Sequence, residues 1–154
     1  MRNTAQHYSK KSNGFTLIEL ILVTAIIGVI TVPFIITYRN SRANQALRTS
    51  AEQVADHARS AHVFAREANE GNGWGITSTD DSSYAIVSGT ETDWNEFSSY
   101  VLQPQITFTN DFFVWFEIGT GAIDSGQTIE LSNLNGTKSK VDINENGVVE
   151  VTNE

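Results

Sequence analysis

The feature that most constrains this chain is an apolar stretch near its start. From Phe15 to Tyr38, Glu19 is the only residue charged at neutral pH, so the last 19 residues of this stretch contain no Asp, Glu, Lys or Arg. About 20 apolar residues in a helix are enough to cross the hydrocarbon core of a bilayer. The sequence therefore predicts a membrane-spanning helix at residues 15–38 and excludes a purely soluble globule.

Charge is distributed unevenly on the two sides of this stretch. Residues 1–14 carry three bases and no acid, whereas residues 70–154 carry fourteen acids and two lysines, and the chain of 154 residues has a net charge of −8. Because basic residues mark the cytoplasmic side, we expect a cytoplasmic N-terminus and an outer C-terminal region. The acidic outer region argues against nucleic acid as a partner. The chain has no Cys, which excludes disulfides and thiolate chemistry.

A short motif lies directly before the apolar stretch. A basic leader ends at Gly14, an aromatic residue follows at Phe15, and a lone carboxylate comes four positions later at Glu19. A secretory signal would place its cleavage site after the apolar segment instead. The motif, which continues in the same pattern through Gly28, resembles the class III signal of type IV pilins and type II secretion pseudopilins. This resemblance implies that a prepilin peptidase cuts between Gly14 and Phe15 and that the new Phe15 amine is N-methylated.

Glu19 lies one turn into the predicted membrane span. A carboxylate there costs roughly 2.5–3.5 kcal/mol on insertion scales, so it needs a partner or an interfacial position. The resemblance implies that the partner is the Phe15 amine of a neighbouring subunit, and that this pair sets the axial register during filament assembly. The alternative is that Glu19 reaches the lipid headgroups of an ordinary signal anchor.

The helix is predicted to continue beyond the membrane. Gly28 and Pro33 predict a kink near residues 28–33, although both residues are also simply tolerated in membrane helices. Beyond the span, small apolar residues recur at steps of four and three up to Ala68, which predicts an amphipathic stalk at residues 39–70 that ends near Asn69. We expect the stalk to pack on the C-terminal domain, with a free coiled coil as the alternative.

The remaining residues, 71–154, have the pattern of a small antiparallel β-domain. Seven runs of β-branched and aromatic residues predict strands at 75–79, 84–88, 106–109, 112–118, 128–131, 140–143 and 148–152. Asn135-Gly136 and Asn146-Gly147 predict tight turns, the second of which closes a hairpin. The chain is thus expected to be an α+β protein in which a long N-terminal α-helix, part transmembrane and part stalk, packs on an antiparallel β-sheet domain.

Two details of this domain are expected from its apolar residues. The continuous run from Phe112 to Phe116 predicts a central strand covered on both faces. The segment from Gly89 to Gln103 is interpreted as a variable insertion whose three aromatic residues, Trp94, Phe97 and Tyr100, dock into the core.

The order of motifs in the mature chain is similar to that of the GspH/FimT group of minor pseudopilins and minor pilins. The residues that carry this likeness are Arg59-Ser60-Ala61, Ile106-Thr107-Phe108, Val114-Trp115-Phe116 with Gly119 or Gly121 after it, Ile129-Glu130-Leu131, and Val141-Asp142-Ile143 through Gly147-Val148-Val149. The resemblance implies a minor filament subunit in the bacterial inner membrane, with its C-terminal domain in the periplasm. Its partners would be prepilin peptidase, other pilin or pseudopilin subunits, and the inner-membrane platform of the assembly machine.

Three functions are compatible with this sequence. The first is a minor pseudopilin of a type II secretion system. The second is a FimT-like minor pilin involved in DNA uptake or adhesion. The resemblance implies DNA binding through basic residues near the C-terminus in some such pilins, and this chain has only Lys138 and Lys140 there. The third is a signal-anchored envelope domain that never polymerises.

No catalytic constellation emerges from the sequence, so neither an enzymatic activity nor a cofactor is expected. The stalk histidines His57 and His62 are five residues apart, which places them on different faces of a helix, and they are interpreted as solvated. Asp142, Asn144 and Asn146 resemble the opening of a calcium loop, but Asn153 stands where that loop requires its closing acid. A β-hairpin turn is the preferred interpretation over a metal site.

Overall fold

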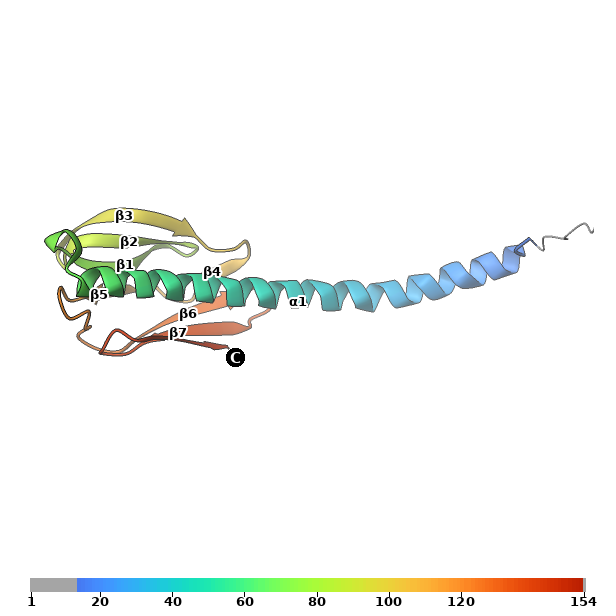
Figure 1. Ribbon diagram of the computed structural model, residues 1–154. Coiled ribbons are helices and arrows are strands. Elements are labelled where there is room, and N and C mark those ends of the chain that lie inside the picture. The colour runs from blue at the N-terminus through green and yellow to red at the C-terminus, as the bar shows by residue number, and fades with distance from the viewer. Residues whose placement is uncertain (1–13, 154) are drawn as a thin grey trace, which may run out of the picture. The chain divides into compact units, whose positions relative to one another are not determined.

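The computed structural model describes residues 14–153, so the leader residues 1–13 and Glu154 lie outside it. The protein has the predicted α+β fold: one long helix, α1 (Leu17–Arg66), a 3-10 turn, η1 (Asn69–Gly71), and eight β-strands (Figure 1). The chain divides into two compact units, one ending at Tyr38 and one beginning at Arg39. The boundary falls within α1, so each unit is described separately below.

The first unit contains the start of α1. The backbone N–H of Glu19 donates a hydrogen bond to Oγ1 of Thr16 at 3.3 Å, which caps the N-terminus of the helix. The helix is continuous through Gly28 and Pro33, and a bend at this point stays a prediction. Hydroxyl groups near the proline bond to the preceding turn: Thr31 donates to the carbonyl of Ile27 at 2.6 Å.

The second unit contains the rest of α1, and the helix ends about three residues earlier than predicted. Arg66 is the last helical residue, because Ala68 and Glu70 adopt left-handed backbone conformations with φ of 50° and 57°. The backbone N–H of Gly119 donates to the carbonyl of Ala65 at 2.8 Å. This bond satisfies one of the carbonyls left free at the helix end.

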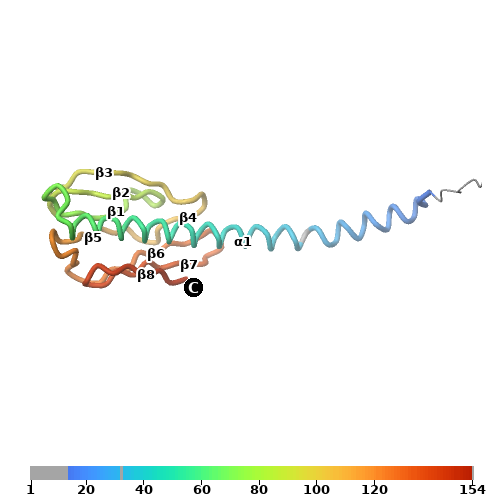
Figure 2. The backbone as a smooth tube through the Cα atoms, viewed as in Figure 1, coloured from blue at the N-terminus to red at the C-terminus, as the bar shows by residue number. Residues whose placement is uncertain are grey.

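Two four-stranded antiparallel sheets make up the rest of this unit. The first has the order β3-β2-β1-β5 and contains β1 (Gly73–Asp80), β2 (Ser83–Thr90), β3 (Asp93–Val101) and β5 (Phe113–Phe116). The second has the order β4-β6-β7-β8 and contains β4 (Ile106–Phe108), β6 (Gln127–Asn133), β7 (Lys138–Ile143) and β8 (Val149–Asn153). Figure 2 traces the connections and shows β8 beside β7.

The core lies where the second half of α1 meets both sheets. The helix contributes a buried stripe of small side chains, Leu47, Ala51, Val54, Ala55, Ala58, Ala61 and Ala65, each at most 2% exposed. These residues form one cluster with Trp74 and Phe116 of the first sheet and Leu131 and Val141 of the second. The prediction that the stalk packs on the β-domain is therefore confirmed.

The segment from Gly89 to Gln103 contains a strand that the sequence did not predict, and its interpretation as a variable insertion stays a prediction. Most of it forms β3, which pairs with β2 along its length with one register shift. Trp94 and Phe97 are 41% and 56% exposed, so they are not buried in the core, although the ring of Phe97 meets the buried Trp74 edge-on; Tyr100 is half-buried. The sequence did not predict β3 because most of its residues are polar. A strand at the edge of a sheet can form with few apolar residues, since the neighbouring strand supplies its hydrogen bonds.

The prediction of a central strand covered on both faces at Phe112–Phe116 is also wrong. The strand β5 is at the edge of its sheet and pairs with β1. Val114 and Phe116 are buried on the face toward α1, while Phe113 and Trp115 are half-buried on the opposite face. The run is continuously apolar because Trp115 covers the outer face of β1, where two glycines leave room for its indole.

Candidate functional site

The cleavage junction lies just before α1. Gly14 is exposed, and a Cβ atom added to it would have no heavy atom within 4 Å, apart from its chain neighbours. Phe15 is 83% exposed. The described residues around position 14 therefore give no steric reason for a glycine there.

Glu19 lies in the first turn of α1, and its side chain is exposed. A carboxylate in the first turn of a helix interacts favourably with the partial positive charge of the helix N-terminus. This interaction offsets part of the cost of a charge near an apolar span, but it leaves the carboxylate oxygens accessible to a cation from outside the chain. The predicted amine of a neighbouring Phe15 is such a cation.

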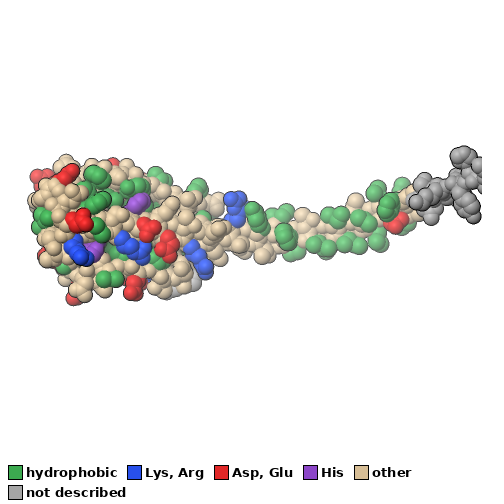
Figure 3. Space-filling view, in the orientation of Figure 1, with side chains coloured by type: hydrophobic (Ala, Val, Ile, Leu, Met, Phe, Trp, Pro, Cys, Tyr) green, Lys and Arg blue, Asp and Glu red, His purple; other side chains and the backbone are tan. Residues whose placement is uncertain are grey.

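The apolar span is bare in this unit. Every side chain that the structure describes from Phe15 to Tyr38 is exposed, and hydrophobic side chains are spread along the visible face of this half in Figure 3. Within the part of the chain that the structure describes, α1 is the one helix long and apolar enough to cross a membrane. A surface of this kind is stable only in lipid or against other protein chains.

The hydroxyl groups of Thr24, Thr31 and Thr37 within the span are satisfied locally. The hydroxyls of Thr24 and Thr37 donate to the carbonyls of Ile21 and Pro33 at 2.9 and 3.0 Å. Because a hydroxyl in hydrocarbon needs a hydrogen-bond partner, this arrangement suits the helix for an environment without water.

The two histidines of α1 are packed, so their interpretation as solvated side chains is wrong. Nδ1 of His57 lies 2.8 Å from the hydroxyl of Tyr84, and its ring stacks on Tyr100 with centroids 3.8 Å apart. Burial lowers the pKa of His57, although Asp56 partly opposes this shift. Burial also raises the pKa of the Tyr84 phenol. The contacts of His57 with Tyr84 and Tyr100 thus join α1 to β2 and β3.

His62 occupies a slot between two loops. A Cβ atom added to Gly121 would lie 2.5 Å from Cδ2 of His62, and one added to Gly147 would also collide with the imidazole. The ring meets Phe116 edge-on, with centroids 5.7 Å apart. Burial, and secondarily the charge of Arg66, lower the pKa of His62. Both histidines therefore act as packing residues on different faces of the helix, and the spacing argument about their faces is confirmed.

The possible calcium loop is a β-hairpin turn. Oδ1 of Asp142 accepts a hydrogen bond from the hydroxyl of Thr128 at 2.6 Å, and Oδ1 of Asn144 accepts the backbone N–H groups of Asn146 and Val148 at 3.0 Å each. Gly147 has φ of 75°, as the turn requires. One oxygen of Asp142 and the side-chain oxygen of Asn144 thus accept hydrogen bonds within the hairpin, and no cluster of three or more acidic, His or Cys side chains suited to a metal occurs in residues 14–153.

The C-terminal lysines do not form a free basic patch. Nζ of Lys138 pairs with Oε1 of Glu130 across the β6–β7 ladder, and this hydrogen bond is the main cause of the lowered pKa of Glu130. Lys140 of β7 is the register partner of Glu130 on β6, so it lies directly opposite the same carboxylate residue. Each lysine near the C-terminus is therefore close to a carboxylate.

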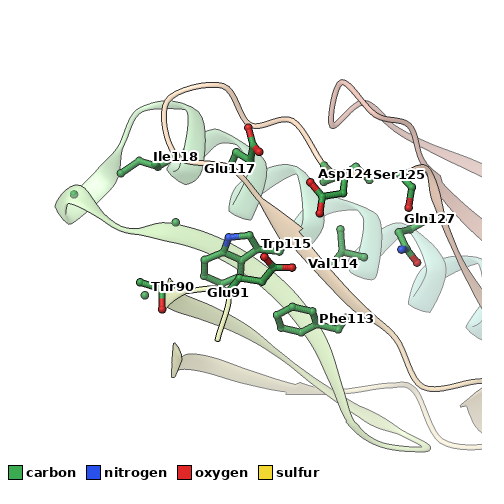
Figure 4. Close-up of a pocket in the computed structure, with 14 residues that line it drawn as sticks. Thr90, Glu91, Phe113, Val114, Trp115, Glu117, Ile118, Asp124, Ser125 and Gln127 are labelled. Carbon is green, nitrogen blue, oxygen red and sulfur yellow. The ribbon is translucent and has the colours of Figure 1, made fainter. Parts of the chain in front are cut away.

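A groove in the outer unit was not predicted from the sequence. Its volume is about 640 Å³, and it is lined by residues of β5, the β5–β6 connection, and the adjoining ends of β1 and β2 (Figure 4). The indole of Trp115 lies flat over Gly73 and Gly75, since Cβ atoms added there would lie 2.5 and 2.8 Å from it. The alternation Gly73-Trp74-Gly75 was the available signal, because glycine inside a strand often marks a close approach by another group.

Comparison with known proteins identifies one feature of the chain. Residues 9–35 match the prokaryotic N-terminal methylation motif, a segment that contains Gly14, Phe15 and Glu19. No curated protein and no solved structure matches the chain. The motif supports membership of the pilin-like superfamily, and it implies processing by prepilin peptidase, assembly with other pilin subunits, and anchoring in a membrane by the N-terminal helix.

Proposed function

We propose that this chain is a minor subunit of a type IV pilus-like filament, specifically a GspH/FimT-like pseudopilin of a type II secretion system. The observation that carries the proposal is the methylation motif at residues 9–35, placed at the start of a helix whose apolar half is left exposed by the residues that the structure describes. The protein acts as a structural subunit and as the substrate of a peptidase, without enzymatic activity of its own.

In the proposed mechanism, the chain enters the inner membrane with its N-terminus in the cytoplasm and its outer unit in the periplasm. Prepilin peptidase then cuts after Gly14, and Phe15 becomes the N-methylated terminus. The Glu19 carboxylate of the entering subunit pairs with the Phe15 amine of a neighbour, which removes an uncompensated charge from an apolar environment. The exposed apolar side chains of α1 pack on neighbouring helices as the subunit leaves the lipid.

The secretion role is favoured over DNA uptake because of charge. The residues from Arg39 to Glu154 contain seven Lys and Arg against seventeen Asp and Glu, and Lys138 is already paired. Recognition of DNA phosphates depends on Lys and Arg side chains, and this unit has few of them relative to its acidic side chains. Loss of secreted proteins from a strain that lacks this gene, with its surface pili intact, would support the secretion role, and the reverse result would support a pilus.

The assembly mechanism is tested by replacing Glu19 with Ala in cells that contain the complete machine. We expect the variant to be cleaved and to stay in the membrane, because the change removes a polar group from the span. Its incorporation into filaments should fall by about tenfold or more, since loss of a charge pair in an apolar site costs at least about 1.4 kcal/mol. Cross-linking to neighbouring subunits and quantitative blotting of sheared filaments measure this.

Two further variants complete the test. Gly14→Val should block cleavage, although the structure has open space at this position, whereas Gly28→Ala, which also meets open space, should be processed normally. Mass spectrometry of the membrane-extracted protein reports the N-terminus. An intact leader in cells with active peptidase would refute the processing step, and normal incorporation of Glu19→Ala would refute the pairing step.

A further inference from the structure

The groove beside β5 has main-chain groups without partners along one wall. The backbone N–H of Ser78 donates to the carbonyl of Phe112, which identifies Ser78 and Phe112 as a hydrogen-bonded pair of the β1–β5 ladder. Hydrogen-bonded pairs alternate along an antiparallel ladder, so Val114 and Phe116 also bond to β1. The N–H and C=O groups of Phe113 and Trp115 therefore point away from β1, toward the free edge.

These edge groups are unused in the protein. In residues 14–153, β5 pairs with β1 alone, and no hydrogen bond to the main chain of Phe113 or Trp115 occurs on the free side. Phe113, Val114 and Trp115 line the groove, and so do Ile123, Asp124, Ser125 and Gln127. A free strand edge beside a groove is the arrangement to which an extended peptide adds as a further strand.

The side chains of the groove select the charge of its occupant. Glu91, Glu117 and Asp124 line the groove, and no Lys or Arg does. In the described part of the chain, Glu91 and Asp124 form no ion pair. Figure 4 shows these carboxylates around the same opening as the indole of Trp115. The unit from Arg39 onward has a net charge of −10, which attracts cations and repels polyanions such as nucleic acid.

The indole of Trp115 favours arginine over lysine as the cationic side chain of the occupant. One face of its indole rests on Gly73 and Gly75, and the other face lies toward the groove. A planar guanidinium stacks on an indole and forms two parallel hydrogen bonds with a carboxylate, so arginine suits both features of this site. Lysine would meet the charge requirement without the planar stacking.

We infer that this groove binds an extended, arginine-containing segment of a partner protein. The segment adds to the free edge of β5 through the main-chain groups of Phe113 and Trp115, and an arginine side chain stacks on Trp115 beside Glu91 and Asp124. The site uses no residue of the N-terminal assembly segment. The inference is therefore independent of the proposed function, and its failure would leave the proposed function intact. It gives the outer unit a partner of defined chemistry.

The test uses the full chain in detergent micelles and a fluorescein-labelled heptapeptide of alternating threonine and arginine. Fluorescence anisotropy at about 150 mM salt should show saturable binding in roughly the micromolar range. A peptide with citrulline in place of arginine keeps the planar group without the charge, and it should bind at least about tenfold more weakly. Equal binding of the two peptides, or no saturable binding, would overturn the inference.

Two N-methylated peptides test the strand addition. In an extended strand, the N–H groups of alternate residues point to opposite edges. N-methylation of the arginines alone, or of the threonines alone, should therefore abolish binding in one case and leave it nearly unchanged in the other. Equal effects of the two modifications would exclude addition to β5.

Protein variants locate the site. Glu91→Gln and Asp124→Asn should each weaken binding by about fivefold to tenfold, because each removes a carboxylate beside the proposed guanidinium. Glu150→Gln is the matched control, since it makes the same change of charge at an exposed position of β8 outside the groove. An equal loss in the control would show diffuse attraction only and would overturn the site. Saturable binding of a neutral oligosaccharide that displaces the peptide would also overturn it.

Discussion

The two halves of α1 belong to one continuous helix but place their apolar residues in opposite environments. Residues 17–38 are rich in large side chains such as Leu17 and Ile18, which are 77% and 71% exposed. Residues 39–66 bury smaller side chains, and Ala51, Ala58 and Ala61 are fully covered by the two sheets. The first half therefore depends on surroundings outside the chain, whereas the second half is the centre of a core.

The size of the side chains explains this difference. An alanine buries little apolar area, so the stripe on the second half contributes less by its own burial than by the close approach that it permits. Trp74, Phe116 and Leu131 come from both sheets and pack on this stripe. Large side chains at the same positions would hold the sheets away from the helix. Large side chains are suited to the first half, because lipid and neighbouring helices accommodate them.

The largest effect on stability is expected when a large side chain is placed in the half of α1 that buries small ones. Ala58→Leu inserts three carbons into a fully packed position and should lower the free energy of unfolding of the outer unit by about 3 kcal/mol. The matched variant Ala25→Leu lies on the exposed half and should change it by less than about 0.5 kcal/mol. Denaturant titration followed by the near-ultraviolet circular dichroism of the aromatic residues measures both, and equal stabilities would contradict the comparison.

The second largest effect on stability is expected at the slot between two loops that holds the His62 side chain of α1. Gly147→Ala places a methyl group against His62 and the carbonyl of Gly121 and also forces a left-handed conformation, so we expect a loss of about 2–3 kcal/mol. Gly136→Ala is the control, because Gly136 has a similar φ of 79° but open space around it. A loss of about 1 kcal/mol is expected there. Equal losses would show that the His62 slot adds nothing to the turn geometry.

The smallest effect is the pH dependence that His62 brings to the outer unit. Its pKa is lower in the folded state than the ordinary value of 6.5, so the unfolded chain binds a proton more readily as the pH falls. Stability from this source is therefore complete above about pH 6.5 and is lost progressively below it. His62→Gln should show a smaller decrease in unfolding free energy between pH 7.0 and 5.5 than the native chain, and identical decreases would contradict the assignment. His57 is expected to act in the same direction, since its pKa is also lowered.

Local patterns in the sequence were sufficient for much of the fold. The seven predicted strands correspond to β1, β2 and β4 to β8, and the turns at Asn135-Gly136 and Asn146-Gly147 join the strands as expected. These signals are local, because strand alternation and turn residues act over a few neighbouring positions. The strand β3 was missed because its sequence, Asp93–Val101, is mostly polar, although it pairs with the strand directly before it, β2, across a two-residue turn.

The candidate site near the N-terminus could be predicted without a structure. Gly14, Phe15 and Glu19 lie close together in the chain, and a hydrophobic span is recognised from composition alone, so no tertiary contact was needed to find them. The surroundings of Trp115 and His62, in contrast, became visible in the folded chain. The indole lies over glycines of a neighbouring strand, and the imidazole lies between two loops separated from it by more than fifty residues. Such environments arise from long-range packing, in which a side chain's partners are chosen by the fold rather than by its neighbours in the sequence.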